Sequence, residues 1–406
     1  MRVVYLHQYF VTPSMVGGTR SYEMARRLVS AGHEVHMVTT DQEGVSSNGG
    51  WRNSCEAGIH VHWTPVRYDN SMGYSERIRA FLKFAIRAAR KAEQLRGDVI
   101  FATSTPLTIA IPAVYAAWRT RVPMIFEVRD LWPAVPIAIG AIKHPVAKQA
   151  ALWLERFAYR NAARIVALAP GMRDEIVAKG YPSDRIAVIP NGCDLDVFSD
   201  AAGAGDLRVR HSWLGPRPLL VFAGTFGLVN GMEYLVRLAT AIAQIDAEVR
   251  IAAVGTGREF ERTRQLAIDS GVLDKNLFLL GKVPKREAAV WTLAADMTLA
   301  LFTGPEIVWR DAVQNKFFDS LAAGKPVASN FAGWQSKVAA DARAGLILSS
   351  GDLEGAARDV VRALRDPLWM AEAARAARNL AESRFDRNML AAELARVLED
   401  ARVQPG

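Results

Sequence analysis

The sequence predicts an α/β protein built from two Rossmann-like domains that face a cleft. Three observations support this prediction. The chain has 406 residues, enough for two domains of ordinary size. Half of its residues are hydrophobic and 23% are charged, so it can bury substantial cores. In both halves short apolar segments alternate with longer helical patterns, the order that produces parallel sheets covered by helices.

Composition and charge limit the classes of binding partner and the cellular compartment that we expect for this protein. A net charge of +8 suits nucleic acid, an anionic membrane surface or anionic substrates. The chain has no zinc-finger spacing and no basic recognition helix, so we expect no nucleic acid. Cys55 and Cys193 lie far apart without metal-ligand neighbours, which indicates reduced thiols. Because the chain opens on a strand pattern without a signal peptide, we expect a cytoplasmic protein.

One uncharged run, residues 100–118, approaches the length of a membrane span. It contains Pro106 and Pro112, and its first part has a strand pattern. A buried strand, loop and helix is therefore the preferred interpretation, and a membrane span is the alternative.

The chain opens with a strand over residues 2–10, a loop, a helix over 21–31 and a second strand over 34–40. This order is typical of a mononucleotide-binding unit. The loop carries Gly17 and Gly18, which either let a ligand approach the helix start or simply form a tight turn. The dinucleotide fingerprint Gly-x-Gly-x-x-Gly is absent, which argues against a nicotinamide enzyme.

A basic helix is predicted over residues 74–97. Its cations interleave at helical spacing with apolar Ile78, Phe81, Leu82, Ala85 and Ile86. The pattern fits a core-facing helix with a solvated charged back. It also fits a surface that contacts anionic lipid headgroups.

Further strands are predicted over 98–103, 123–128, 164–168 and 186–189. The second of them ends in the charged group Glu127, Arg129 and Asp130, where open α/β sheets place ligand contacts. These three residues either bind and orient a second substrate or form a structural ion pair. A later Asp194-Leu-Asp196 is interpreted as turn chemistry, and no metal is predicted.

The predicted N-terminal domain covers residues 1–198. Residues 199–217 are rich in Ala, Gly and Pro and are expected to form the linker. The C-terminal domain is expected over 218–385, with strands over 219–223, 248–254, 277–281 and 297–302. Residues 386–406 are expected to form a helix that returns to the N-terminal domain.

Glycine turns follow two strands of the C-terminal half. Gly224 follows the first, and Gly255 and Gly257 follow the second, where they are expected to face the cleft.

The most informative stretch runs from Gly304 to Ser329. It predicts a loop, a short helix from Asn315 to about Ala323 with Asn315 as N-cap, and Gly324 as the helix stop. The helix N-terminus around Gln314 and Asn315 suits an anion. Asp319, one turn further, can accept hydrogen bonds from a ribose diol. The alternative is an ordinary surface helix with solvated acids.

Asp311-x7-Asp319, followed by Ser-Leu-Ala-Ala-Gly-Lys-Pro-Val, resembles the paired-acid signature of family-4 retaining glycosyltransferases, which have the GT-B fold. That signature is usually Glu-x7-Glu. The Asn-Lys-Phe-Phe-Asp version and the opening Leu-His-Gln-Tyr-Phe resemble a branch acting in bacterial O-antigen, colanic-acid and exopolysaccharide synthesis. The resemblance covers nearly the whole chain.

The resemblance implies roles for individual residues. Asp311 would contact the donor sugar, Asp319 would bind the ribose, and the backbone at Lys282 and Val283 would pair with the base. Gly17 and Gly18 would lie near the donor phosphates and the acceptor. The family usually clamps the diphosphate with an Arg and a Lys where this chain has Thr225 and Asn230. We therefore expect Lys316, Arg310 or backbone N–H groups to supply the missing charge.

The implied reaction moves a sugar, for example an N-acetylated deoxyhexose, from a UDP-sugar with retention and without a metal or another cofactor. The implied acceptor is a polyprenyl-diphosphate-linked sugar or oligosaccharide at the inner face of the cytoplasmic membrane. A nucleotide-sugar epimerase, a Rossmann oxidoreductase and a non-catalytic assembly partner remain as alternatives.

Overall fold

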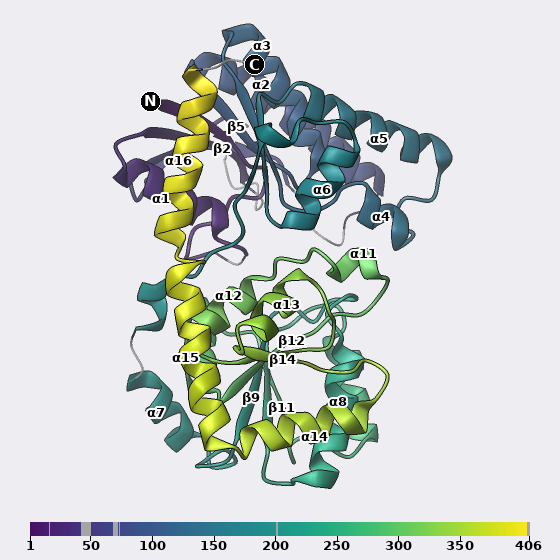
Figure 1. Cartoon of the computed structure of the whole chain (residues 1–406). Coiled ribbons are helices and arrows are strands. Elements are labelled where there is room, and N and C mark those ends of the chain that lie inside the picture. The colour runs from purple at the N-terminus through teal and green to yellow at the C-terminus, as the bar shows by residue number, and fades with distance from the viewer. Residues whose placement is uncertain (16, 42–49, 68–71, 73, 200–201, 404–406) are drawn as a thin grey trace. The chain divides into compact units, whose positions relative to one another are not determined.

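The structure is a computed structural model that describes residues 1–15, 17–41, 50–67, 72, 74–199 and 202–403. The chain divides into two compact units (Figure 1). Unit 1 contains Met1–Pro190 and Arg387–Gly406, and unit 2 contains Asn191–Asp386.

Unit 1 is built on an eight-stranded sheet of described residues. Every neighbouring pair is parallel except β3 and β4, which pair antiparallel. The strands in sheet order are β3 (Arg52–Glu56), β4 (Ile59–Pro65), β2 (Glu34–Asp41), β1 (Arg2–Leu6), β5 (Val99–Thr103), β6 (Met124–Val128), β7 (Arg164–Ala167) and β8 (Ile186–Val188). The helices are α1 (Arg20–Ser30), α2 (Tyr74–Leu95), α3 (Ala110–Thr120), α4 (Ala134–Ala138), α5 (Pro145–Arg160), α6 (Pro170–Ala178) and α16 (Arg387–Val403), with 3-10 turns η1 (Leu107–Ile109) and η2 (Ser183–Arg185).

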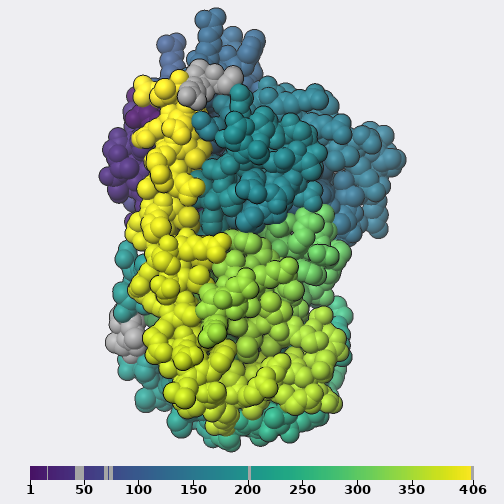
Figure 2. Space-filling model, in the orientation of Figure 1, coloured from purple at the N-terminus to yellow at the C-terminus, as the bar shows by residue number. Residues whose placement is uncertain are grey.

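The last helix belongs to the core of unit 1. Leu390, Leu394 and Leu398 of α16 are buried with Tyr5 of β1 and Met24 of α1. Figure 2 shows the yellow atoms of α16 beside the purple atoms of the N-terminal segment. The spacing of four between these leucines places them on one helix face, which explains why the chain end packs there.

Unit 2 is built on a six-stranded parallel sheet of described residues. Its order is β11 (Leu277–Gly281), β10 (Arg250–Val254), β9 (Leu219–Ala223), β12 (Met297–Ala300), β13 (Val327–Ser329) and β14 (Gly345–Ile347). Its helices are α7 (Ala202–Arg210), α8 (Met232–Ile245), α9 (Phe260–Asp269), α10 (Lys285–Ala294), α11 (Glu306–Trp309), α12 (Asn315–Ala322), α13 (Trp334–Asp341), α14 (Leu353–Leu364) and α15 (Pro367–Ser383), with a 3-10 turn η3 (Leu195–Phe198).

Successive residues of β9 enter different cores, as a strand covered on both faces requires. Leu220 and Phe222 pack with α8 and α14, whereas Leu219 and Val221 pack with α7 and α10. Unit 2 is therefore a doubly wound α/β sheet, and unit 1 has the same kind of architecture. The predicted fold class, two Rossmann-like domains, is confirmed for the two units.

The segment expected to be a linker differs from the prediction. Residues 202–210 form α7, and the Trp213 ring stacks on Phe278 with centroids 3.7 Å apart. Arg208 donates to Asp296 at 2.9 Å, while Leu207 and Leu214 are buried. The sequence did not predict this helix because its hydrophobic periodicity is weak. Tertiary contacts, and not an amphipathic stripe, hold the helix in unit 2.

The uncharged run at residues 100–118 divides between β5, η1 and α3, as the preferred interpretation expected. Among the described residues no helix is both long and apolar enough to cross a membrane.

Candidate active site

The strand order of unit 2 reverses between β9 and β12. The chain leaves β9 through α8 on one face of the sheet and leaves β12 toward α12 on the other. In doubly wound sheets, ligands bind outside the carboxyl ends of the strands at such a reversal. This topology selects the loop after Gly224 and the start of α12 as the place to look for a site.

Backbone hydrogen bonds join the glycine turn at Gly224 to the turn at Gly255 and Gly257. Gly224 N–H donates to Val254 O at 2.9 Å, and Phe226 N–H donates to Thr256 O at 3.0 Å. A Cβ on Gly255 would lie 1.9 Å from Gly224 O, and one on Gly257 would lie 2.5 Å from Phe226 O. Gly255 and Gly257 are therefore needed for the close packing of the two turns, and their contact with a ligand stays a prediction.

The loop after Gly224 carries no cation of its own. Thr225 is exposed, and Asn230 N–H donates to Gly227 O at 3.0 Å. Gly231, with φ of +67°, precedes the first residue of α8. This loop therefore offers backbone groups and the Thr225 hydroxyl but no positive charge.

The start of α12 differs by one residue from the prediction. Gln314 is the N-cap, with extended φ and ψ of −72° and 131°, and Asn315 is the first helical residue with an exposed side chain. Gln314 N–H donates to Gln335 Oε1 at 2.9 Å, so a side chain from α13 fixes this corner. Asn315 is not the cap because tertiary bonding to Gln335 sets where the helix begins. Gly324, with φ of +65°, follows the helix as expected.

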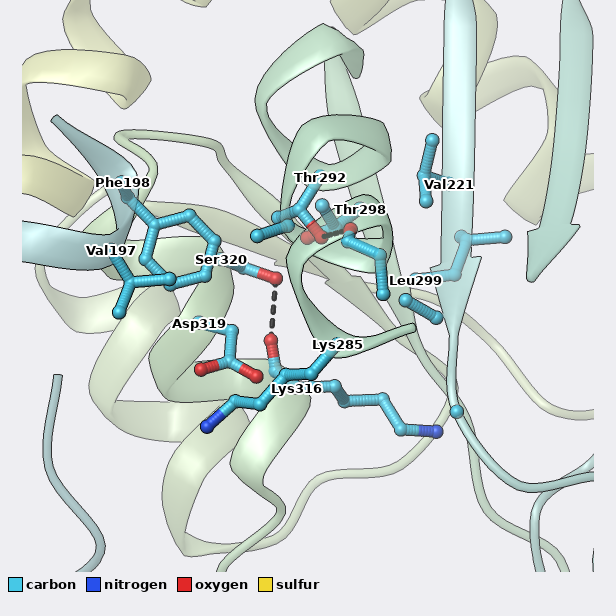
Figure 3. A pocket seen from close by; sticks show the side chains of 14 residues that line it. Val197, Phe198, Val221, Lys285, Thr292, Thr298, Leu299, Lys316, Asp319 and Ser320 are labelled. Carbon is cyan, nitrogen blue, oxygen red and sulfur yellow. Dashed lines mark hydrogen bonds between the residues drawn. The ribbon is translucent and has the colours of Figure 1, made fainter. Parts of the chain in front are cut away.

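A pocket of about 160 Å³ lies between the end of β9 and α12 (Figure 3). Asp319 and Ser320 of α12 line it, together with Gly224, Lys285 and Lys316. Its remaining lining is mainly apolar and includes Val197, Phe198, Val221, Ala288 and Leu299. An apolar wall with a few convergent charges is typical of a small-molecule site.

Lys316 extends from the first turn of α12 toward the end of β9 (Figure 3). Its Nζ lies 3.8 Å from the centre of the Phe222 ring, and a Cβ on Gly224 would be 3.1 Å from this nitrogen. The Nζ is buried and finds no hydrogen-bond partner among the described residues. Burial lowers the pKa of Lys316 to about 7. A buried amine without an acceptor is costly, so it indicates a place for an anion.

Asp311 lies in the loop before α12 and is buried. Its Oδ2 accepts from Arg310 Nε at 2.8 Å. Arg310 is partly exposed, so this cation is engaged by Asp311 and still reaches solvent. Asp319, in contrast, lines the pocket directly.

The structure adds Lys285, which the sequence reasoning missed. Lys285 is the first residue of α10, is exposed, and lines the pocket wall that also contains Asp319 (Figure 3). The signal that could have identified Lys285 was its position, two residues after Val283 and directly after a proline. Lys282 is exposed, whereas Val283 packs against the Trp213 and Trp291 cluster.

In unit 1, Glu127 proves to be structural. Its carboxylate accepts from Arg20 Nη2 at 2.8 Å and from Thr103 Oγ1 at 2.5 Å, and both charged side chains are fully buried. Arg20 also donates to the carbonyls of Ile189 and Pro190. Burial alone would raise the pKa of Glu127, but the charges of Arg20 and Arg129 lower it. Glu127 therefore does not bind substrate directly, which corrects that interpretation.

The strand ends of unit 1 also converge, at the reversal between β1 and β5. Arg129 N–H donates to Ser104 Oγ at 2.9 Å, and Arg129 Nη1 lies 3.5 Å from His7 Nε2. Asp130 is exposed beside them. Arg129 and Asp130 thus stay available as substrate contacts.

His7 and Gln8, which follow β1, are further candidates that the sequence reasoning missed. His7 Nδ1 and both amide atoms of Gln8 are buried without hydrogen-bond partners among the described residues. Burial and then the charge of Arg129 hold the pKa of His7 well below its usual value. Polar residues immediately after a buried strand were the signal for them.

The Gly17–Gly18 loop precedes α1. Both glycines are exposed, and Gly17 has φ of +149°. No group of three or more metal-ligating side chains occurs in the described ranges. Asp194 is buried at the start of unit 2 and Asp196 lies in η3.

Both halves of the chain match known protein families. Residues 17–192 match the family described as "Glycosyl transferase 4-like domain", and residues 217–366 match "Glycosyl transferases group 1". A D-inositol 3-phosphate glycosyltransferase of Xylanimonas cellulosilytica is 29% identical over 45% of each chain, so the match spans less than half of that relative. A GDP-mannose-dependent α-(1-6)-phosphatidylinositol monomannoside mannosyltransferase of Mycobacterium tuberculosis is 23% identical over 73% of this chain and 74% of that one.

Solved structures share the fold of both units. Anabaena HepE in complex with UDP has a TM-score of 0.74 at 16% identity and covers 98% of this chain and 100% of that one. Sucrose-phosphate synthase of Thermosynechococcus elongatus has a TM-score of 0.77 at 17% identity and covers 99% of each chain. The two domain matches and this shared architecture show that the chain belongs to the glycosyltransferases of the family 4/group 1 type, with the GT-B fold.

Proposed function

We propose that this glycosyltransferase moves a sugar from a UDP-sugar to a lipid-linked or oligosaccharide acceptor in bacterial surface polysaccharide synthesis. The observation that carries the donor half is the pocket at the β9–β12 reversal. It brings together the Asp319 carboxylate, the Gly224 backbone and the enclosed amine of Lys316. A diol-binding acid beside an unsatisfied cation matches a ribose joined to phosphates.

In this proposal unit 2 binds the donor in three parts. Asp319 accepts hydrogen bonds from the ribose hydroxyls, and Lys285 lies on the same wall of the pocket. The first-turn N–H groups of α12 and the Lys316 amine receive the diphosphate. Asp311, oriented by its bond to Arg310, contacts the sugar. Val283 and Lys282, after β11, present backbone to the base.

The chemical step then depends on electrostatics. The bond from the sugar carbon to the diphosphate oxygen breaks, and the acceptor oxygen forms a new bond to the same carbon with retention. The proton of the acceptor hydroxyl passes to an oxygen of the departing diphosphate. Negative charge grows on the leaving diphosphate, where preorganised N–H groups and the Lys316 cation stabilise it. We propose that these groups carry this charge without a metal or a further cofactor.

The acceptor would bind unit 1. Arg129 and Asp130 lie at the strand ends there, and the exposed Gly17–Gly18 loop leaves backbone accessible. A polyprenyl-diphosphate-linked sugar is the proposed acceptor, which would place the reaction at the inner face of the cytoplasmic membrane. An N-acetylated deoxyhexose is the proposed donor sugar. Both rest on the resemblance to the polysaccharide branch.

The choice between UDP and GDP is the first test. HepE was solved with UDP, whereas the mycobacterial relative is described as GDP-mannose-dependent. Isothermal titration of the protein with UDP, with GDP and NAD as comparisons, should give micromolar binding for UDP alone. Asp319→Ala should abolish it, and Glu261→Ala, which removes an exposed acid of α9, should not.

Four results would change the proposal. Selective GDP binding would replace the donor class and keep the transferase. NAD binding would favour an oxidoreductase. Absence of any nucleotide binding would make the missing cations at Thr225 and Asn230 decisive and favour a non-catalytic assembly partner. Turnover of a bound UDP-sugar without any acceptor would indicate an epimerase.

A further inference from the structure

The basic helix α2 has an exposed apolar stripe. The core face of α2 consists of Ala80, Phe84, Ala85, Ala88 and Ala92. Ile78, Leu82 and Ile86 lie outside that face and are 46%, 48% and 59% exposed. Their spacing of four residues aligns them along one side of the helix. The core-facing interpretation of this helix therefore holds for other residues of α2 and not for these three.

Cations flank this stripe. Arg79 and Lys83 each follow one of its apolar residues, and Arg90 lies one turn beyond Ile86. All three are exposed, and no ion pair to them is found within the described ranges. Arg87 and Lys91, by contrast, face the Trp51 ring at 5.7 Å and 5.3 Å. The exposed face of α2 therefore alternates aliphatic groups with uncompensated positive charge.

The neighbouring helix α3 continues the same chemistry. Ile111, Tyr115 and Trp118 follow one another at near-turn spacing and are 38%, 38% and 72% exposed. Tyr115 Oη donates to Glu93 Oε2 at 3.0 Å, which attaches α3 to α2. Arg119 donates to the other oxygen of Glu93 at 2.8 Å. Trp and Tyr rings with one polar end are favoured at a lipid headgroup boundary.

We propose that the α2–α3 face, defined by Ile78, Leu82, Ile86, Ile111, Tyr115 and Trp118 with Arg79, Lys83 and Arg90, binds an anionic lipid bilayer as an interfacial surface. An apolar protein partner would leave the three cations without acids. A bilayer surface receives both features, because aliphatic side chains enter the acyl boundary while Lys and Arg remain among anionic headgroups. This gives a physical place to the membrane association suggested for a lipid-linked acceptor, and the binding itself requires neither acceptor nor donor.

Vesicle sedimentation tests the proposal with the full chain. Vesicles of phosphatidylcholine with 30% phosphatidylglycerol should bind the protein at low salt at least tenfold more tightly than pure phosphatidylcholine. Each cation should contribute about fivefold. The triple change Arg79→Gln, Lys83→Gln and Arg90→Gln should therefore lower binding by about 100-fold. Leu82→Ser with Ile86→Ser should lower it more than tenfold.

Matched changes in unit 2 serve as controls. Arg264→Gln, Lys275→Gln and Arg375→Gln remove three exposed cations, and Val209→Ser with Leu368→Ser removes two residues that are 84% and 79% exposed. These variants should bind vesicles like the unaltered chain. All variants should keep UDP affinity and melting temperature, which verifies that they fold.

Three outcomes would overturn the proposal. The unaltered chain could ignore phosphatidylglycerol vesicles, or the apolar variant could bind them normally. Light scattering could instead reveal a dimer that Leu82→Ser dissociates, which would assign this face to a second copy. Because the vesicles contain no acceptor and no nucleotide sugar, failure here leaves the transferase proposal standing. A failed UDP titration would equally leave the vesicle result valid.

Discussion

The Nζ of Lys316 lies 3.8 Å from the centre of the Phe222 ring, and no described residue accepts a hydrogen bond from it. The ring face offers some electrostatic attraction to a cation, but it does not replace water. Burial therefore lowers the pKa of this amine to about 7. A diphosphate that binds beside this amine would favour its protonated form.

Binding of UDP should be coupled to proton uptake above pH 7. In the free protein Lys316 is largely charged below about pH 7 and neutral above it. A bound diphosphate raises its pKa, because an opposite charge favours the protonated amine. Affinity should therefore fall by up to about tenfold per pH unit above pH 7. Titration calorimetry at pH 7, 8 and 9 in buffers of different ionisation enthalpy measures both the slope and the proton.

Lys316→Met is the matched variant for that slope, because it keeps an unbranched chain over the Phe222 ring. It should remove the pH dependence between 7 and 9 and weaken UDP at pH 7 by well over tenfold, as should Lys316→Ala. An unchanged dissociation constant at pH 7 would exclude Lys316 as the diphosphate cation. The phosphate of UDP, with a pKa near 6, cannot itself produce the slope.

The two acids of the 311–319 motif should separate in kinetics. Asp311→Asn should lower turnover on the order of 100-fold, because it weakens a contact to the reacting sugar. It should leave UDP affinity nearly unchanged, since UDP lacks that sugar. Asp319→Asn should lower UDP affinity strongly and should affect turnover less. Equal effects of both variants on UDP binding would contradict the assignment.

The buried Arg20–Glu127 pair should stabilise unit 1 rather than bind substrate. Removing one partner leaves an uncompensated buried charge, so Glu127→Gln or Arg20→Met should lower the free energy of unfolding by about 3–5 kcal/mol. The surface pair Arg358–Glu354 provides the comparison, where Glu354→Gln should cost less than about 1 kcal/mol. Urea unfolding followed by circular dichroism measures both. A stable Glu127→Gln with impaired turnover would restore Glu127 as a substrate contact.

Gly255 should tolerate no side chain. A Cβ there would lie 1.9 Å from Gly224 O, and backbone cannot move aside as a flexible side chain can. Gly255→Ala should therefore cost at least about 1–3 kcal/mol of unfolding free energy. Gly205→Ala is the control, because nothing lies within 4 Å of a Cβ at that position and its φ is ordinary. Similar melting temperatures for the two variants would show that the glycine turns can separate.

Local pattern predicted most of the elements that position the site. The strands at 219–223 and 277–281 were predicted to the residue, and the start of the last helix was predicted within one residue of Arg387. Buried parallel strands have continuous apolar runs, and the glycines after them are local signals. The antiparallel hairpin β3–β4 was missed. Its exposed, polar β3 has no comparable run.

The features of the candidate site likewise fall into those that the sequence predicts and those that need the tertiary structure. The spacing of Asp311 and Asp319 and the missing cations at Thr225 and Asn230 are properties of the chain alone. The N-cap at Gln314 depends on Gln335, which is 21 residues away, and the structural role of Glu127 depends on Arg20, which is 107 residues away. Such partners leave no local trace because they meet only when separate elements pack.

By itself the sequence determined the two-domain α/β fold and the motif that carries the proposed donor site, because both depend on local hydrophobic periodicity and on the spacing of residues along the chain. Only the tertiary structure decided which charges are enclosed and which face solvent. It enclosed the amine of Lys316 against Phe222, and it left Leu82 exposed on a helix whose pattern also fitted a core. Burial is a property of the surroundings of a residue, and those surroundings come from distant parts of the chain.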